Sequence, residues 1–165
     1  MLKSVEQLIL ALTKEYEMYK DYFEVAKKKK EIIINGHVKE LDHITKIEQD
    51  MIMTMGKIDH IRTSIIGNLL MELNIKSVDS LTELTEYLPE QAASKIMDIK
   101  EKLEMIIKQI KDLNDLNSSL IKQSLEYIDF NMNLMMSLEA KGSTYGSNAD
   151  EKDLKQRSSV FDVKI

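Results

Sequence analysis

The chain has 165 residues and a formal net charge of −5 at pH 7, with few aromatic residues, one proline and no cysteine. This composition suits long helices, and the lack of cysteine excludes disulfides, thiolate metal sites and thiol nucleophiles and fits a cytoplasmic protein. The negative charge gives no reason to expect nucleic-acid binding. No apolar run approaches the ~18 residues of a membrane span, so we expect no stable membrane insertion.

Apolar heptad columns predict three long helices. The first covers residues 4–34, with Ser4 as its expected N-cap and Asn35–Gly36 as its stop, because glycine tolerates the left-handed conformation of a helix end. The second covers about 37–73 and carries an apolar stripe from Leu41 to Leu69. Residues 74–88 break the period, and Asp79 or Ser80 is expected to cap a short connecting helix there. Pro89 suits the first turn of the third helix, which is expected to run to about residue 139.

These elements predict an all-α fold, an antiparallel bundle of three long helices with a short connecting helix. The bundle is expected to occupy residues 1–141. Two glycines and many polar residues predict a flexible C-terminal tail over residues 142–165. The third helix is longer than the second by about a dozen residues, or ~20 Å, so its C-terminal part is expected to extend beyond the hairpin of the first two. The apolar side chains expected there need a partner.

The sequence contains no convincing catalytic or metal-binding pattern. Glu40 and His43 match one Glu-x-x-His unit of the di-iron helical bundles, but the second unit that those sites need is missing. There is no Gly-rich phosphate loop and no His-Glu-x-x-His motif. We therefore expect a protein that is not an enzyme and that uses no cofactor.

One heptad column of the third helix turns polar in its C-terminal half, while the neighbouring column stays apolar. The polar column is Asn117, Ser124 and Asn131. The apolar column is Leu120, Tyr127 and Leu134, and beside it run Ile121, Ile128 and Met135. A straight helix drifts by ~20° per heptad relative to a strict seven-residue repeat. The buried stripe would therefore move toward the neighbouring apolar column and leave the polar column at its partly wet margin. Polar groups in a seam can also fix the register of a bundle. From spacing alone these two explanations are favoured over a third, a groove that accepts an amphipathic helix of a partner.

A resemblance to a known family favours the groove. The segment "QIKDLNDLNSSLIKQSLEYIDF" (109–130) resembles the most characteristic helix of the FlgN family of flagellar type III export chaperones. Its pattern Leu-Asn-x-x-Asn-x-x-Leu-(Leu/Ile) lies here at Leu113, Asn114, Asn117, Leu120 and Ile121. The second helix is similar to the family at Asn35–Gly36, Glu40–Leu41, Glu48–Gln49 and Arg62. The resemblance covers nearly the whole chain.

The resemblance implies a cytoplasmic chaperone that binds the C-terminal segments of the hook–filament junction proteins FlgK and FlgL and delivers them to the export gate. A tyrosine near the C-terminus of such chaperones is thought to contact the gate component FlhA, and Tyr145 is the matching position. The client-binding residues expected on this basis are Asn117, Leu120, Ile121, Ser124, Tyr127, Ile128, Asn131 and Leu134.

The heptads fit a second hypothesis equally well, a structural coiled-coil protein that assembles with itself and has no client. A homodimer is compatible with both hypotheses. The apolar face has three columns, which suits a bundle better than a two-stranded seam.

Overall fold

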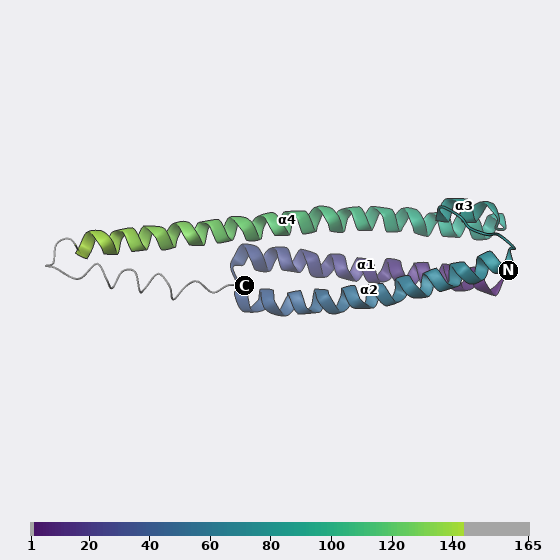
Figure 1. The fold of residues 1–165 in the computed structure, drawn as a ribbon, viewed down its shortest axis with the longest axis horizontal. Coiled ribbons are helices and arrows are strands. Elements are labelled where there is room, and N and C mark those ends of the chain that lie inside the picture. The colour runs from purple at the N-terminus through teal and green to yellow at the C-terminus, as the bar shows by residue number, and fades with distance from the viewer. Residues whose placement is uncertain (1, 144–165) are drawn as a thin grey trace. The chain divides into compact units, whose positions relative to one another are not determined.

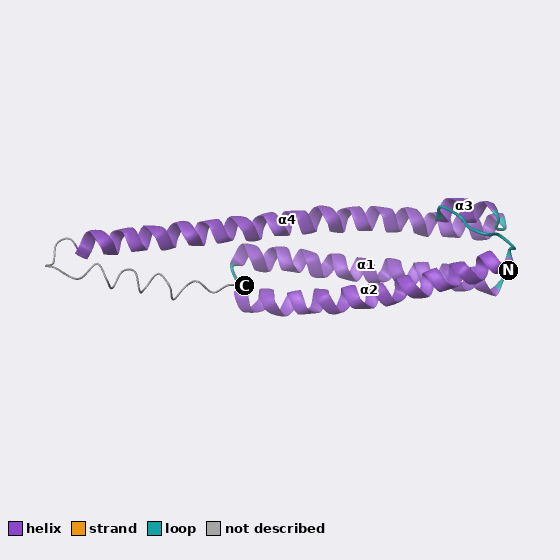
Figure 2. Ribbon diagram, in the orientation of Figure 1, coloured by secondary structure: helices purple, strands orange, loops and turns teal. Residues whose placement is uncertain are grey.

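The structure, a computed structural model, describes residues 2–143, with side chains through residue 140. These residues form four helices, α1 (Lys3–Asn35), α2 (Val38–Glu72), α3 (Leu81–Glu86) and α4 (Glu90–Ser143), joined by short loops (Figures 1 and 2). The bounds of α1 and α2 agree with the predicted ones to within one residue. The predicted end of α4 at about residue 139 is wrong, because the helix continues through Gly142 to Ser143.

Local sequence accounts for most of the helix ends. Gly36 has φ 69°, and its N–H donates to the carbonyl of Ile33 at 3.2 Å, which stops α1 as predicted. Ser80 is the N-cap of α3, with its hydroxyl accepting from the Glu83 N–H at 3.0 Å. The prediction that Ser4 caps α1 is wrong, because the helix begins one residue earlier and the Ser4 hydroxyl instead donates to Glu72 at 2.6 Å.

The helices α1 and α2 run antiparallel and lie side by side (Figure 1). Ser4 near the start of α1 contacts Glu72 at the end of α2, whereas Lys29 near the end of α1 contacts Glu48 near the start of α2. The helix α1 buries ten of its residues and α2 only three. The apolar stripe predicted for α2 is buried at Ile44 and Leu69, exposed at Ile47 and partly buried at its other positions.

Two hydrophobic clusters bring α1 together with the first part of α4. One cluster also includes residues of α2 and α3, and its buried members include Leu8, Leu12, Leu69, Leu84, Ala92, Ile96 and Leu103. The other is formed by Tyr22, Ala26, Ile106 and Ile110, with Met51 and Met55 of α2 packed against it. The prediction of an all-helical chain is confirmed for the described residues. A single antiparallel bundle that includes the whole of the third long helix stays a prediction.

The chain divides into two compact units, Met1–Ile121 and a second that begins at Lys122. Within the second unit the structure describes the last part of α4, residues 122–143. Large apolar side chains are exposed along it, namely Leu125, Tyr127, Ile128, Phe130, Met132, Leu134, Met135, Met136 and Leu138. A helix with so many uncovered apolar side chains presents a surface suited to a partner.

Candidate functional site

Asn117 links α4 to α1. Its side chain is 3% exposed, and its Nδ2 donates to the backbone carbonyl of Ala26 at 3.0 Å. A backbone carbonyl only accepts, so the atom of the Asn117 amide that faces it must be the nitrogen. The amide oxygen Oδ1 is therefore the atom that does not take part in this contact. That oxygen is buried without a hydrogen-bond partner. The prediction that Asn117 sits at a partly wet margin is wrong, because the small, fully buried side chain of Ala26 lets the two helices approach closely there.

A pocket of about 350 Å³ opens beside Asn117, between α1, α2 and α4 within the first unit. We call it the polar pocket, and its walls include Lys29, Glu48, Asn114, Asn117 and Ser118. Lys29 Nζ lies 2.6 Å from Glu48 Oε2. The other carboxylate oxygen of Glu48 is buried without a hydrogen-bond partner, as is Asn117 Oδ1. Both oxygens are buried, so their residues line the pocket without exposing these two acceptors to it.

The remaining residues expected to bind a client are distributed along α4. Leu120 and Ile121, in the first unit, are partly buried. In the second unit Ser124, Tyr127, Ile128 and Leu134 are exposed, and Asn131 is partly buried. Tyr145, the expected export-gate contact, lies outside the described residues. Which of these side chains contact a client stays a prediction.

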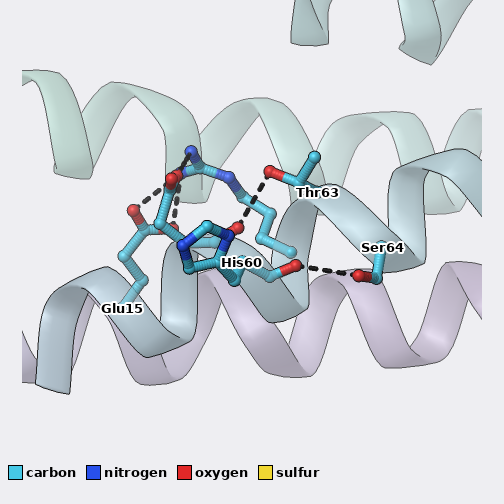
Figure 3. A network of polar contacts seen from close by, with 6 residues as sticks. Glu15, His60, Thr63 and Ser64 are labelled. Carbon is cyan, nitrogen blue, oxygen red and sulfur yellow. Dashed lines mark hydrogen bonds and ion pairs between the residues drawn. The ribbon is translucent and has the colours of Figure 1, made fainter.

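A second buried polar contact joins α1 to α2 (Figure 3). Arg62 Nη1 donates to both carboxylate oxygens of Glu15, at 2.6 and 2.7 Å, and Nη2 donates to Asp59. The Glu15 side chain is 8% exposed. Burial, and then the negative charge of Glu15, raises the pKa of the nearby Tyr19 above its ordinary value of 10.0. The sequence pattern singled out Arg62 but not its partner, since Glu15 lies 47 positions away.

An apolar groove of about 550 Å³ also lies between α1 and α2. Leu10 and Ile61 line it and are both 56% exposed. Neither belongs to the apolar columns of the sequence analysis, so the groove was missed. In the sequence, the only sign of this groove is that Leu10 and Ile61 are apolar residues outside the predicted columns.

Across residues 2–143, no group of three or more His, Asp or Glu side chains is arranged to hold a metal ion. None of the helices described there has a stretch long and hydrophobic enough to cross a bilayer.

Comparison with known families decides the class of protein. The chain matches the family model described as FlgN protein over residues 1–153. It belongs to the FlgN family. The predicted family is thereby confirmed, and the FlgN family is one of flagellar export chaperones. No match was found among curated proteins or among solved structures.

The structure gives physical roles to the polar residues that carried the resemblance to the FlgN family. Asn114 and Asn117 lie at the polar pocket together with Glu48, and Arg62 pairs with Glu15. Asn114 Nδ2 also lies 3.5 Å from the Tyr22 hydroxyl, a long hydrogen bond. These side chains join separate helices of the first unit, so the polar positions of the motif mark contacts between helices.

Proposed function

We propose that this FlgN-family chain is a cytoplasmic chaperone that binds the C-terminal helices of the hook-associated proteins FlgK and FlgL and delivers them to the flagellar type III export gate. The observation that carries the proposal is the run of exposed apolar side chains on α4 from Leu125 to Leu138. Such a run on a soluble helix favours a partner with an apolar face.

The mechanism that we propose is reversible covering of an apolar face. A subunit helix that will be buried in a filament is apolar on one face, and in solution that face drives association before assembly. An amphipathic helix laid against α4 removes the face from water. A few buried anchors carry most of the affinity in such contacts, and Leu120, Tyr127 and Leu134 are our candidates.

The other proposed client contacts are Ile121 and Ile128 on the apolar side, and Asn117, Ser124 and Asn131 on the polar side. In the antiparallel bundle of the three long helices, α1 and α2 hold α4 in place for the client. Tyr145 contacts the gate component FlhA. Binding and release of this kind require no cofactor and no hydrolysis by the chaperone.

Co-purification with the C-terminal segments of FlgK and FlgL tests the proposal. We expect the full chain to retain at least one of them, and Tyr127→Asp to lose it, because a charge in an apolar contact is costly to desolvate. Leu10→Asp is the matched control, since it places the same charge on an exposed apolar residue of the α1–α2 groove, 56% exposed against 67% for Tyr127.

Two results would overturn the proposal. Loss of the client with Leu10→Asp but not with Tyr127→Asp would move the site to the groove between α1 and α2. A large, elongated self-assembly that retains neither segment, detected by mass measurement in solution, would favour the structural coiled-coil hypothesis instead.

A further inference from the structure

The apolar groove between α1 and α2 is open at the surface of the first unit. Leu10 and Ile61 in its wall are each 56% exposed. The hydroxyl of Ser64, also in the wall, donates to the backbone carbonyl of His60 at 3.0 Å, so this donor is already used (Figure 3). A volume of about 550 Å³ gives room for more than one side chain. The groove therefore suits apolar side chains of a partner.

The wall of the groove differs in charge from the chain as a whole. The chain has 28 Asp and Glu residues against 23 Lys and Arg residues. None of the ten residues of the wall is acidic, whereas Lys14 is basic and exposed and His60 can gain a proton. An occupant with acidic side chains beside its apolar ones is therefore favoured.

One side of α4 in the second unit has these properties. Its apolar members are Leu125, Met132 and Met136, which are 57%, 39% and 55% exposed. Spacings of 7 and 11 residues bring them to the same side of the helix. Asp129 follows Leu125 by about one turn, and Glu139 follows Met136 in the same way. We call these five residues the acidic apolar face.

The acidic apolar face is separate from the main anchors proposed for the client. At 3.6 residues per turn, Tyr127 and Leu134 point about 160° and 180° around the helix from Leu125. None of the five residues of the acidic apolar face is among the proposed client contacts. A client on the Tyr127 side therefore leaves the acidic apolar face in water, where it needs a second partner.

The groove and the acidic apolar face match in length and charge. The face spans about 17 Å from Leu125 to Met136, and the α2 side of the groove spans about 15 Å from Ile58 to Asn68. Residues 123–140 contain three acidic residues and no lysine or arginine, which complements Lys14 in the wall. Two methionines on the face add side chains that adapt to an irregular groove.

We infer that the apolar groove binds the acidic apolar face of a second copy of this chain. Apolar contact with Leu10 and Ile61 excludes water, and the acidic residues of the face are attracted to Lys14. Each copy has one groove and one face, so reciprocal exchange covers both surfaces in a pair. The inference does not rest on the proposed function, and it leaves the Tyr127 side of α4 available to a client.

The test is the mass of the full chain in a dilution series, measured by light scattering. We expect the average mass to rise toward that of two chains as the concentration increases. Leu10→Asp and Leu125→Asp change residues that are 56% and 57% exposed, and each should raise the dissociation constant about 10-fold or more. Tyr127→Asp, on the other side of α4, should leave it unchanged.

Two results would overturn the inference. A mass of one chain at every concentration would leave the groove to another protein. Association that is lost with Tyr127→Asp but kept with Leu10→Asp and Leu125→Asp would place the contact between copies on the other side of α4.

A mixture of the two variants tests whether the groove and the face bind each other. Leu10→Asp keeps an intact face and Leu125→Asp keeps an intact groove, so an equimolar mixture should form pairs that neither variant forms alone at the same concentration. Both positions are exposed, so circular dichroism should show unchanged helix content in each variant. A mixture as dissociated as its components would overturn the inference.

The same variants separate this inference from the proposed function. Leu125→Asp should lose the pairing of copies and retain the client segment, whereas Tyr127→Asp should retain the pairing and lose the client. Pairing that depends on Leu10 and Leu125, with neither client segment retained by the full chain, would support the inference and overturn the chaperone proposal.

Discussion

The contact between Glu15 and Arg62 allows a quantitative test of the packing of α1 against α2. We consider Arg62→Met, which keeps an unbranched stem and good helix propensity but removes the guanidinium. The Glu15 carboxylate, 8% exposed, then loses the two hydrogen bonds of 2.6 and 2.7 Å that it accepts from Arg62 Nη1. A buried charge without its partner is strongly destabilising.

The structure sets the size of the effect. Breaking a fully buried ion pair costs about 3–5 kcal/mol. The Arg62 side chain is 28% exposed, so water reaches the vacated position and we expect a smaller loss, about 2–3 kcal/mol. Glu15→Met should cost less, since Arg62 keeps Asp59 as a partner. The double variant should be within about 1 kcal/mol of the parent, because a buried pair replaced by apolar side chains is often neutral.

Urea unfolding followed by circular dichroism measures these free energies, and the four proteins form a double-mutant cycle. Lys46→Met is the matched control. Lys46 pairs with Asp42 across one helical turn at 2.9 Å, but both side chains are about 70% exposed, so its loss should be within ~0.5 kcal/mol. An Arg62→Met loss no larger than that of Lys46→Met would refute the reasoning. So would a double variant as unstable as Arg62→Met, since the stranded carboxylate would then not be the cause.

Three further outcomes are expected. Leu134→Ala should weaken binding of a FlgK or FlgL C-terminal peptide by about 1–3 kcal/mol in calorimetric titration, with little change in the melting temperature because the side chain is exposed; unchanged affinity would remove Leu134 from the anchors. Tyr145→Ala should leave client binding and melting temperature unchanged while reducing client secretion, and a marked loss of stability would refute the gate contact. The raised pKa of Tyr19 means that the folded state holds the phenolic proton more tightly than the unfolded chain. Its contribution to stability is therefore present below pH 10.0 and lost as the pH rises through the raised value. Tyr19→Phe should flatten that alkaline loss in unfolding curves measured against pH, and an identical loss in this variant would assign it to other groups.

The sequence by itself determined the helices and the family. Helix ends depend on neighbours within a few positions, so local chemistry predicted Gly36 as a stop and narrowed the cap of the short helix to Asp79 or Ser80. The apolar columns likewise predicted an all-helical chain, and the order of short motifs along the chain identified the FlgN family. The exceptions were Ser4, a good capping residue that lies inside the helix and bonds to Glu72 instead, and the end of α4, which lies at Ser143 and not near residue 139.

The tertiary structure alone decided what the polar residues do. Heptad spacing gives the direction in which Asn117 points around its own helix, but not what the neighbouring helix presents there. That neighbour is Ala26, 91 positions earlier, whose small side chain brings a backbone carbonyl within reach of the amide. Glu48 was likewise one of the positions that carried the resemblance to the FlgN family, yet its role depends on Lys29 of another helix. Burial and hydrogen bonding of a polar side chain are properties of the pair of surfaces that meet, and a single helical pattern contains only one of them.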